Sequence, residues 1–342
     1  RFLRNELNDR GVRITKQAVS EKRQFIDPQV YIDMNDSLIS KIYAHKDEMT
    51  TFKGFNVYAI DGSIVEIPNT KLTREEFEIP EKTELMKDTS TARISCMADT
   101  KWDFIISSNI TNKSTSEIEH ALMHLDDAKN KIDLTKTITT YDRFYNSIEI
   151  MFKTMLLDSY FIIRGKTHTF KKQQNKMKKE GKTDETHEIN IKKAQINNFF
   201  TEEVKKFARK TREIKVRIVF VKLKTGETET LFTNLPKEIA TPEELKELYG
   251  TRWTIEKNYD RLKNKLHIEK FTGKKKIIIE QDFYSHIYLL NILIALKHDA
   301  EEEITRKPKE TTKYKYVYKS NVNTLIENIK EEMPRILTDD KE

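Results

Sequence analysis

Two runs of β-forming residues surround a turn-prone triplet in the stretch Val57-Tyr58-Ala59-Ile60-Asp61-Gly62-Ser63-Ile64-Val65-Glu66-Ile67. Valine, isoleucine and tyrosine favour strands, whereas the dipeptide Asp-Gly is typical of a hairpin turn. The stretch therefore predicts two short strands joined at Asp61-Gly62. As a turn residue Asp61 would have only a structural role, and the stretch by itself leaves this interpretation open beside a catalytic one.

The residues that follow this stretch predict further strands and helices in alternation. Ser116, with Glu119 three residues later, forms a capping-box pattern that starts a helix. In chain order, strands are expected at 92–98, 104–110, 137–141 and 160–164, and helices at 116–131 and 147–157. This order predicts an α/β fold, a mixed sheet with helices packed on it. Asp142 follows the third of these strands, where it is either a helix-capping residue or an acid available for chemistry.

The middle of the chain has a different pattern. Residues 165–193 lack hydrophobic periodicity and predict a mobile loop, whereas strands are expected at 214–223 and 227–232. We therefore interpret 166–236 as a β-rich insertion. The loop is basic, and its lysines are either solvated or contact DNA: Lys166, Lys171, Lys172, Lys176, Lys178 and Lys179.

Composition narrows the class of protein. Of 342 residues, 37% are hydrophobic and 34% are charged, and the net charge of +7 favours a polyanionic partner such as nucleic acid. The single cysteine, Cys96, excludes an internal disulfide and is expected to be a packed thiol. The longest apolar run, 287–296, is too short to cross a membrane, and no secretory signal opens the chain. We expect a cytoplasmic protein whose sequence, beginning at Arg1, is processed or partial.

A helix expected over 241–266 carries a charged face. Thr241-Pro242-Glu243-Glu244 provides an N-cap, a proline at the first helical position and acids in the first turn. Four side chains then fall within an arc of about 60°: Tyr249, Arg252, Glu256 and Lys263. Glu256 could hold a metal ion while the two cations neutralise phosphate oxygens. The alternative is an ordinary surface pair of Arg252 with Glu256.

The spacing Tyr249-x2-Arg252-x3-Glu256-x6-Lys263 resembles the YREK signature of DDE transposases in insertion-sequence family four. Tyr58-Ala59-Ile60-Asp61-Gly62-Ser63 is similar to the first Asp box of that family. Tyr141-Asp142-Arg143-Phe144-Tyr145 resembles the second, with Phe144 where the family usually has glycine, and Phe161-Ile162-Ile163-Arg164 fits downstream. The resemblance covers about 50–295 and implies a ribonuclease H-like core with an insertion between the second Asp and the Glu.

The resemblance also implies a function and its residues. Asp61, Asp142 and Glu256 would be the catalytic residues and the ligands of two Mg²⁺ or Mn²⁺ ions, and the enzyme would cut transposon ends and join them to target DNA. The partners would be double-stranded DNA (inverted-repeat ends and target), and a second copy of the chain in a homodimer at the bacterial nucleoid. Trp253 would stack on an unpaired base, or else be a rim aromatic. The expected DNA-binding residues are Tyr249, Arg252, Trp253, Lys263, Lys274, Lys275 and Lys276.

The predicted organisation divides the chain into five regions. They are a helical region at 1–50, the first part of the core at 51–165, the insertion at 166–236, the second part of the core at 237–302, and a charged region at 303–342. Two alternatives to a transposase stay open: a ribonuclease H-like nuclease without strand transfer, and an inactive transposase relic that only binds DNA. A second candidate metal pair, His120 and His124, has neither a general base nor a clear third ligand and is disfavoured.

Overall fold

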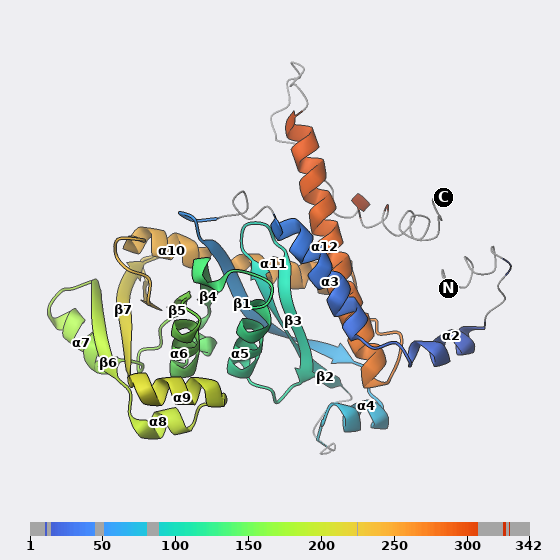
Figure 1. The fold of residues 1–342 in the computed structure, drawn as a ribbon, viewed down its shortest axis with the longest axis horizontal. Coiled ribbons are helices and arrows are strands. Elements are labelled where there is room, and N and C mark those ends of the chain that lie inside the picture. The colour runs from blue at the N-terminus through green and yellow to red at the C-terminus, as the bar shows by residue number, and fades with distance from the viewer. Residues whose placement is uncertain are drawn as a thin grey trace.

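The computed structural model describes residues 15–44, 51–80, 89–223 and 225–306, together with Gly11, Thr324, Leu325 and Asn328. Its centre is one sheet of eight strands in the order β3-β2-β1-β4-β5-β8-β7-β6 (Figure 1). The strands are β1 (Asn56–Ile67), β2 (Ser90–Asp99), β3 (Ile105–Asn112), β4 (Thr137–Tyr141), β5 (Tyr160–Arg164), β6 (Asp184–Asn190), β7 (Glu213–Lys222) and β8 (Thr228–Thr233). The predicted α/β class with a mixed sheet is confirmed.

The direction of pairing changes twice across the sheet. Strands β3, β2 and β1 are antiparallel neighbours, and β1, β4 and β5 run parallel. Strands β5, β8, β7 and β6 are again antiparallel. The first five strands, in the order 3-2-1-4-5, form the ribonuclease H-like arrangement that the sequence predicted.

Strand β1 is continuous, so the predicted hairpin turn at Asp61-Gly62 is wrong. β1 pairs with β2 along most of its length, and Gly62 lies opposite Ser95 within this ladder. Its first five residues also pair with β4, ending at Ile60 opposite Tyr141. The pairing with β2 thus continues through Asp61-Gly62, and this unbroken ladder outweighs the local turn preference of Asp-Gly.

Helices cover both faces of the sheet. In β5, Ile162 packs in one apolar cluster with Leu245 of α10 (Pro242–Gly250), whereas Phe161 and Ile163 belong to the other cluster with Phe152 of α6 (Ile148–Leu156). Because successive side chains of a strand point to opposite faces, α6 and α10 lie on opposite sides of the sheet. Helix α5 (Glu117–Ala128) packs against β1, β2 and β3, and its predicted capping box is present.

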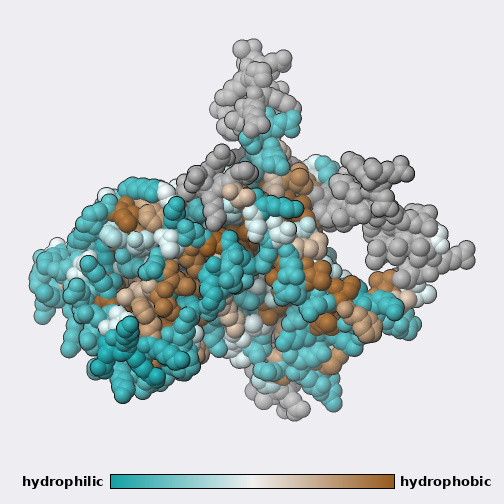
Figure 2. All heavy atoms as spheres, viewed as in Figure 1, coloured by the Kyte–Doolittle hydropathy of each residue, from teal (hydrophilic) through white to brown (hydrophobic). Residues whose placement is uncertain are grey.

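The N-terminal helices pack beside the long helix near the end of the described chain. α2 (Lys16–Arg23) leads into α3 (Gln29–Ile42), which packs along α12 (Lys276–Arg306), as Figure 1 shows. On the face drawn in Figure 2, apolar side chains gather over α3, while hydrophilic ones cover the end of the molecule formed by α7–α9. The predicted charged region at 303–342 lies almost wholly outside the described residues, as does part of the region 1–50.

The predicted mobile loop at 165–193 instead contains a helix and a strand. The segment 166–236 contributes α7 (Lys171–Lys179), α8 (Lys193–Asn197) and α9 (Glu202–Thr211) in addition to β6, β7 and β8. The interpretation as β-rich missed these helices. Helix α7 escaped notice because it buries only Gln174 and Met177 and so has almost no apolar periodicity. Since β8 pairs with β5, the segment extends the core sheet.

The helix predicted over 241–266 is divided into three pieces. Its capping box at Thr241 is present, and α10 ends at Gly250. A turn at Thr251 and Arg252 separates it from α11 (Trp253–Asp260), which continues into a π-helical turn at Arg261–Lys265. The four residues of the predicted charged face therefore do not lie on one regular helix. The remaining short elements are α4 (Lys71–Glu76) and the 3-10 turns Leu134–Lys136 and Arg143–Tyr145. None of the helices in the described ranges combines the length and apolar character that crossing a bilayer requires.

Candidate active site

Two acidic residues follow the paired ends of the central parallel strands. The last pair between β1 and β4 is Ile60 with Tyr141, and the next residues are Asp61 and Asp142. Neighbouring strands lie about 4.8 Å apart, so the register alone brings these two residues close together. The negative charge of Asp142 is one of the influences that raise the pKa of Asp61.

Glu256 is linked to Asp61 through the guanidinium group of Arg252. Arg252 Nη1 lies 3.3 Å from Asp61 Oδ2, and Arg252 Nη2 lies 3.0 Å from Glu256 Oε1. Glu256 stands in the first turn of α11, which packs against β1 and β2. The side chains of a strand and a distant helix therefore meet at one cation. This is more than the surface pair considered above, because Arg252 also binds Asp61.

The electrostatic environment of Asp61 favours a bound cation. Burial raises the pKa of Asp61 to about 6, against the lowering effects of the Gly62 N–H, which donates to Oδ1 at 2.9 Å, and of Arg252. Asp142 and Glu117 raise this pKa further. The ionised carboxylate is thus incompletely compensated, and an additional positive charge would stabilise it.

The backbone of Asp61 is held by side chains from two other elements. Its carbonyl oxygen accepts hydrogen bonds from Ser95 Oγ at 3.0 Å and from the Tyr259 hydroxyl at 2.6 Å. Because Ser95 has one hydroxyl proton, it accepts in turn from His124 Nε2, at 3.0 Å, and His124 Nδ1 accepts from Ser107 at 2.8 Å. This chain of hydrogen bonds fixes the position of β1 at the candidate site.

His124 and His120 have a structural role in this network. Both are buried, and burial lowers the pKa of His124 to about 3 and that of His120 to about 4. His120 Nε2 lies 2.9 Å from the hydroxyl of Thr111. The neutral imidazoles are therefore used to bind hydroxyl groups of β2 and β3. Cys96 is a buried free thiol, as predicted.

Three further predicted site residues surround the acids. The Arg252 guanidinium carbon lies 6.0 Å from the centre of the Tyr249 ring. Lys263 Nζ donates to the backbone oxygen of Ile64 at 2.7 Å, three residues beyond Asp61 along β1. Trp253 is 63% exposed, so its side chain is free of the core. Tyr249 thus lies near Arg252, and Lys263 contacts β1 close to Asp61.

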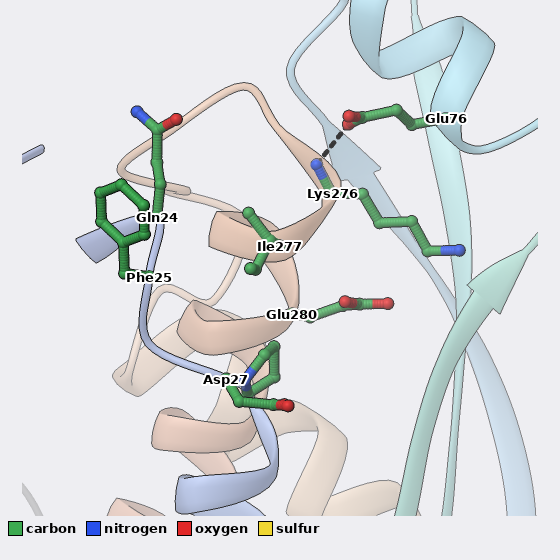
Figure 3. A pocket seen from close by; sticks show the side chains of 8 residues that line it. Gln24, Phe25, Asp27, Glu76, Lys276, Ile277 and Glu280 are labelled. Atoms are coloured by element: carbon green, nitrogen blue, oxygen red, sulfur yellow. Dashed lines mark hydrogen bonds between the residues drawn. The ribbon is translucent and has the colours of Figure 1, made fainter. Parts of the chain in front are cut away.

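The three lysines at 274–276 contact α2 and α4 instead of the carboxylates. Lys275 Nζ binds Gln24, and Lys276 Nζ lies 5.5 Å from the centre of the Phe77 ring. Lys276 lines a separate open pocket of about 540 Å³ together with the acids Asp27, Glu76 and Glu280 (Figure 3). Three carboxylates in this pocket oppose the approach of a phosphate to Lys276.

Sequence reasoning missed the residues that support the acids. Ser95 lies within a predicted strand and Tyr259 within the helix predicted over 241–266, but neither was singled out as a site residue. Arg93 pairs with Glu117 at 3.0 Å, and its guanidinium approaches Gly62 from the same side as the Tyr145 hydroxyl. Alternation along 92–98 gives one usable signal, because Arg93 and Ser95 occupy the same face of that strand. Only tertiary pairing shows that this face meets Asp61.

The donor chemistry of the acids fits a divalent cation. Carboxylate oxygens are hard ligands, and Mg²⁺ is usually held by one or two carboxylates together with water and phosphate oxygens. Asp61 and Asp142 satisfy this requirement. Across the described ranges, however, no group of three His, Cys, Asp or Glu side chains is arranged to hold a metal. Glu256 is separated from Asp61 by Arg252, whose Nε is buried without a hydrogen-bond partner among the described residues and could still donate to a phosphate.

A mixed sheet of this strand order, with acids at the point where the pairing of its two central parallel strands ends, defines a ribonuclease H-like protein. The family described as "Transposase DDE domain" matches residues 53–292, more than two thirds of the chain. The chain therefore belongs to the transposase DDE domain family. The matched range contains both strand acids and Glu256. Insertion-sequence family four and its signature remain predictions within this broader family.

One solved structure similar to this chain is a piggyBac transposase synaptic complex with hairpin DNA, determined by cryo-electron microscopy. The sequence identity is 10% and the TM-score is 0.47, with 85% of this chain and 55% of that chain covered. This chain thus spans about half the length of that protein. No curated protein matches this sequence.

Proposed function

We propose that this protein is a DNA transposase that cleaves and joins DNA phosphodiesters with Asp61, Asp142 and Glu256. The observation that carries the proposal is the register of β1 and β4, which brings Asp61 and Asp142 together in a chain of the transposase DDE domain family. Glu256 is within reach of the same point, because Arg252 contacts both it and Asp61.

The acids would hold Mg²⁺ or Mn²⁺, two ions when the substrate is bound. Such ions activate the attacking hydroxyl and stabilise the leaving oxygen of an in-line displacement at phosphorus. Asp61 and Asp142 would be the first two ligands, a role that the register of β1 and β4 supports. Glu256 becomes available when Arg252 releases it. A DNA phosphate is the natural competitor for Arg252, since a guanidinium binds phosphate oxygens as well as carboxylates.

Arg252 and Lys263 would bind the phosphates on either side of the reacting bond. Arg252 remains protonated, because a guanidinium does not lose its proton in proteins; burial lowers its pKa, but the neighbouring Tyr249, Asp61 and Glu256 raise it above its ordinary value. Lys263 is held beside β1 by the Ile64 carbonyl, which a phosphate could replace. Tyr249 packs against the Arg252 guanidinium and limits where it can move.

The substrates under this proposal are the inverted-repeat ends of a transposable element and a target DNA. Cleavage frees a 3′-hydroxyl, and a second displacement joins it to the target, so one site serves both steps without ATP. Two copies of the chain would pair the two ends. The net charge of +7 supports association with DNA.

The test uses labelled DNA carrying the inverted repeats that flank the gene, a target plasmid and Mg²⁺ or Mn²⁺. The unaltered protein should produce cleaved and joined products. Asp61→Asn, Asp142→Asn and Glu256→Gln should each lower cleavage by about 1000-fold or more, because each removes a group that acts on the reacting phosphate. DNA binding should persist in all three.

A matched control on the same helix is Asp260→Asn, which alters an exposed acid one turn beyond Glu256 and should leave cleavage unchanged. Cleavage without any joined product would identify a nuclease instead. DNA binding by the unaltered protein with no metal-dependent cleavage would identify an inactive relic.

A further inference from the structure

An aromatic side chain is held at the surface directly beside Asp142. Phe144 is 58% exposed, although the residues around it are fixed. Its backbone N–H donates to Asp142 Oδ1 at 2.6 Å, and the next residue, Tyr145, is fully buried with its ring 5.8 Å from that of Tyr141. The 3-10 turn Arg143–Tyr145 is thus anchored at both ends, and the Phe144 ring projects from it into solvent.

Two cations flank the exposed ring. The Arg143 guanidinium carbon and the Lys166 ammonium nitrogen each lie 5.7 Å from the centre of the Phe144 ring. Lys166 follows β5, so the two cations come from different segments of the chain. Within the described part of the chain, no ion pair with a carboxylate involves either cation. Both charges are therefore available to an anionic ligand.

A flat apolar ring with two available cations matches single-stranded nucleic acid. Bases stack on aromatic side chains, and cations beside the ring bind the flanking phosphates. A fully paired duplex offers no such base face, because its bases are already stacked. Both cations lie over the ring, but at 5.7 Å from its centre, and more than half of Phe144 remains exposed. A base can therefore reach the ring when these two flexible side chains turn toward the flanking phosphates.

We propose that Phe144 is a stacking platform for an unpaired DNA base, and that Arg143 and Lys166 bind the phosphates next to that base. The inference rests on the proposed function. It adds a location, beside Asp142, at which the DNA strand next to the reacting bond is held. The ring lies two residues from Asp142, so a stacked base places its own phosphate near the acids. This platform is separate from Trp253, which lies on α11.

The experiment measures binding and stacking without cleavage, in Ca²⁺ instead of Mg²⁺. The probes are a blunt duplex and the same duplex with a short single-stranded overhang containing 2-aminopurine, whose fluorescence falls when it stacks. The unaltered protein should bind the overhang duplex more tightly and quench 2-aminopurine. Phe144→Ala should abolish the quenching and weaken overhang binding by about tenfold, the scale of one lost base–aromatic stack.

Controls separate stacking from folding and from general DNA binding. Phe144→Trp should retain quenching, and Phe200→Ala, which alters a phenylalanine of similar exposure (54%), should change nothing. Arg143→Gln and Lys166→Gln should each reduce the salt dependence of overhang binding by about one unit of slope. Thermal unfolding of each variant checks that the fold is kept.

The possible outcomes distinguish this inference from the proposed function. If Phe144→Ala quenches 2-aminopurine as strongly as the unaltered protein does, the stacking platform is overturned. The proposed function is not affected by that result, because the protein still binds DNA. Equal weakening of blunt and overhang binding by Phe144→Ala also overturns it, because the residue would then lack selectivity for unpaired bases. If the unaltered protein binds neither DNA, both proposals fail.

Discussion

The strand acids and the helix acid of the candidate site are positioned in different ways. Asp61 and Asp142 are placed by backbone pairing between β1 and β4, and the Asp61 carbonyl has two additional hydrogen bonds. Glu256 reaches the same place through a single ion pair with Arg252, on a helix that follows a break in α-helical structure. The strand acids, which we call the strand half of the site, are therefore built into the sheet, whereas the helix acid depends on an exchangeable side-chain contact.

Cation binding gives the largest expected difference between the two halves. Asp61→Asn should weaken Mn²⁺ binding to the DNA-free protein by about 100-fold, because it removes a ligand already in place. Glu256→Gln should weaken it by less than about tenfold, because Arg252 occupies that carboxylate. Calorimetric titration with Mn²⁺ measures both. Equal losses of Mn²⁺ affinity in the two variants would show that Glu256 is as well positioned to bind the cation as Asp61 is.

The hydroxyl of Tyr259 connects the two halves through the Asp61 carbonyl. Tyr259→Phe removes one of the two side-chain hydrogen bonds to this carbonyl and should lower the free energy of unfolding by about 0.5–1.5 kcal/mol. Urea unfolding measures the loss. The control is Tyr160→Phe, which alters a partly exposed tyrosine on β5. A loss no larger than that of the control would show that the strand half does not depend on this bond.

Acidification should lower the free energy of unfolding through His124, which supports the strand that carries Asp61. Its pKa in the folded protein is about 3, below its ordinary value of 6.5, so the neutral form stabilises the fold above pH 6.5. This stability is lost as the pH falls from 6.5 toward 3, by at most about 1.4 kcal/mol per pH unit for one histidine. His124→Gln should show a shallower loss in urea unfolding over this range. His168→Gln, at an exposed position, should keep the slope of the unaltered protein.

Removal of Arg252 should change the pKa of Asp61, because Arg252 is the cation that links Asp61 to Glu256. The positive charge of Arg252 lowers the pKa of Asp61, which is nevertheless raised to about 6 by burial. In Arg252→Gln that pKa should rise further, and the Asp61 carboxyl should remain protonated to a higher pH. Carbon-13 NMR titration of the aspartate carboxyls in cation-free protein follows this change. An unchanged or lower pKa would contradict the contact.

The smallest expected effect is at Gly62. A Cβ atom at this position would lie 3.5 Å from the Ile94 oxygen and 3.6 Å from the Tyr145 hydroxyl, both ordinary contacts. Gly62→Ala should therefore change the free energy of unfolding by less than about 1 kcal/mol. A hairpin turn with a left-handed glycine would be destabilised by more. Thermal unfolding distinguishes the continuous strand from such a turn.

The sequence predicted the elements that have strong local patterns. The capping boxes at Ser116 and Thr241 and the strands between 90 and 164 follow from motifs and periodicity, whereas the role of the three acids stays a prediction. The continuity of β1 could not be predicted, because tertiary pairing with β2 through Asp61 and Gly62 overrides the Asp-Gly signal. Helix α7 was missed for a different reason: two buried side chains among nine give no detectable apolar stripe.

The support of the acids was less predictable than the acids themselves. The two hydrogen bonds to the Asp61 carbonyl come from Ser95 and Tyr259, which are 34 and 198 residues away in the chain. No local pattern encodes such contacts. The contact between Arg252 and Asp61 has the same origin, whereas that between Arg252 and Glu256 follows from helical spacing.

The hydrogen bonds between β5 and β8 bear on how the protein could be shortened. Deleting 166–236 would strip β8 from β5 and leave the N–H and C=O groups of a catalytic-core strand open at the sheet border. Such an open border recruits strands from other molecules. A truncated chain would accordingly aggregate, and a substitute neighbour for β5 would have to be engineered to keep it monomeric.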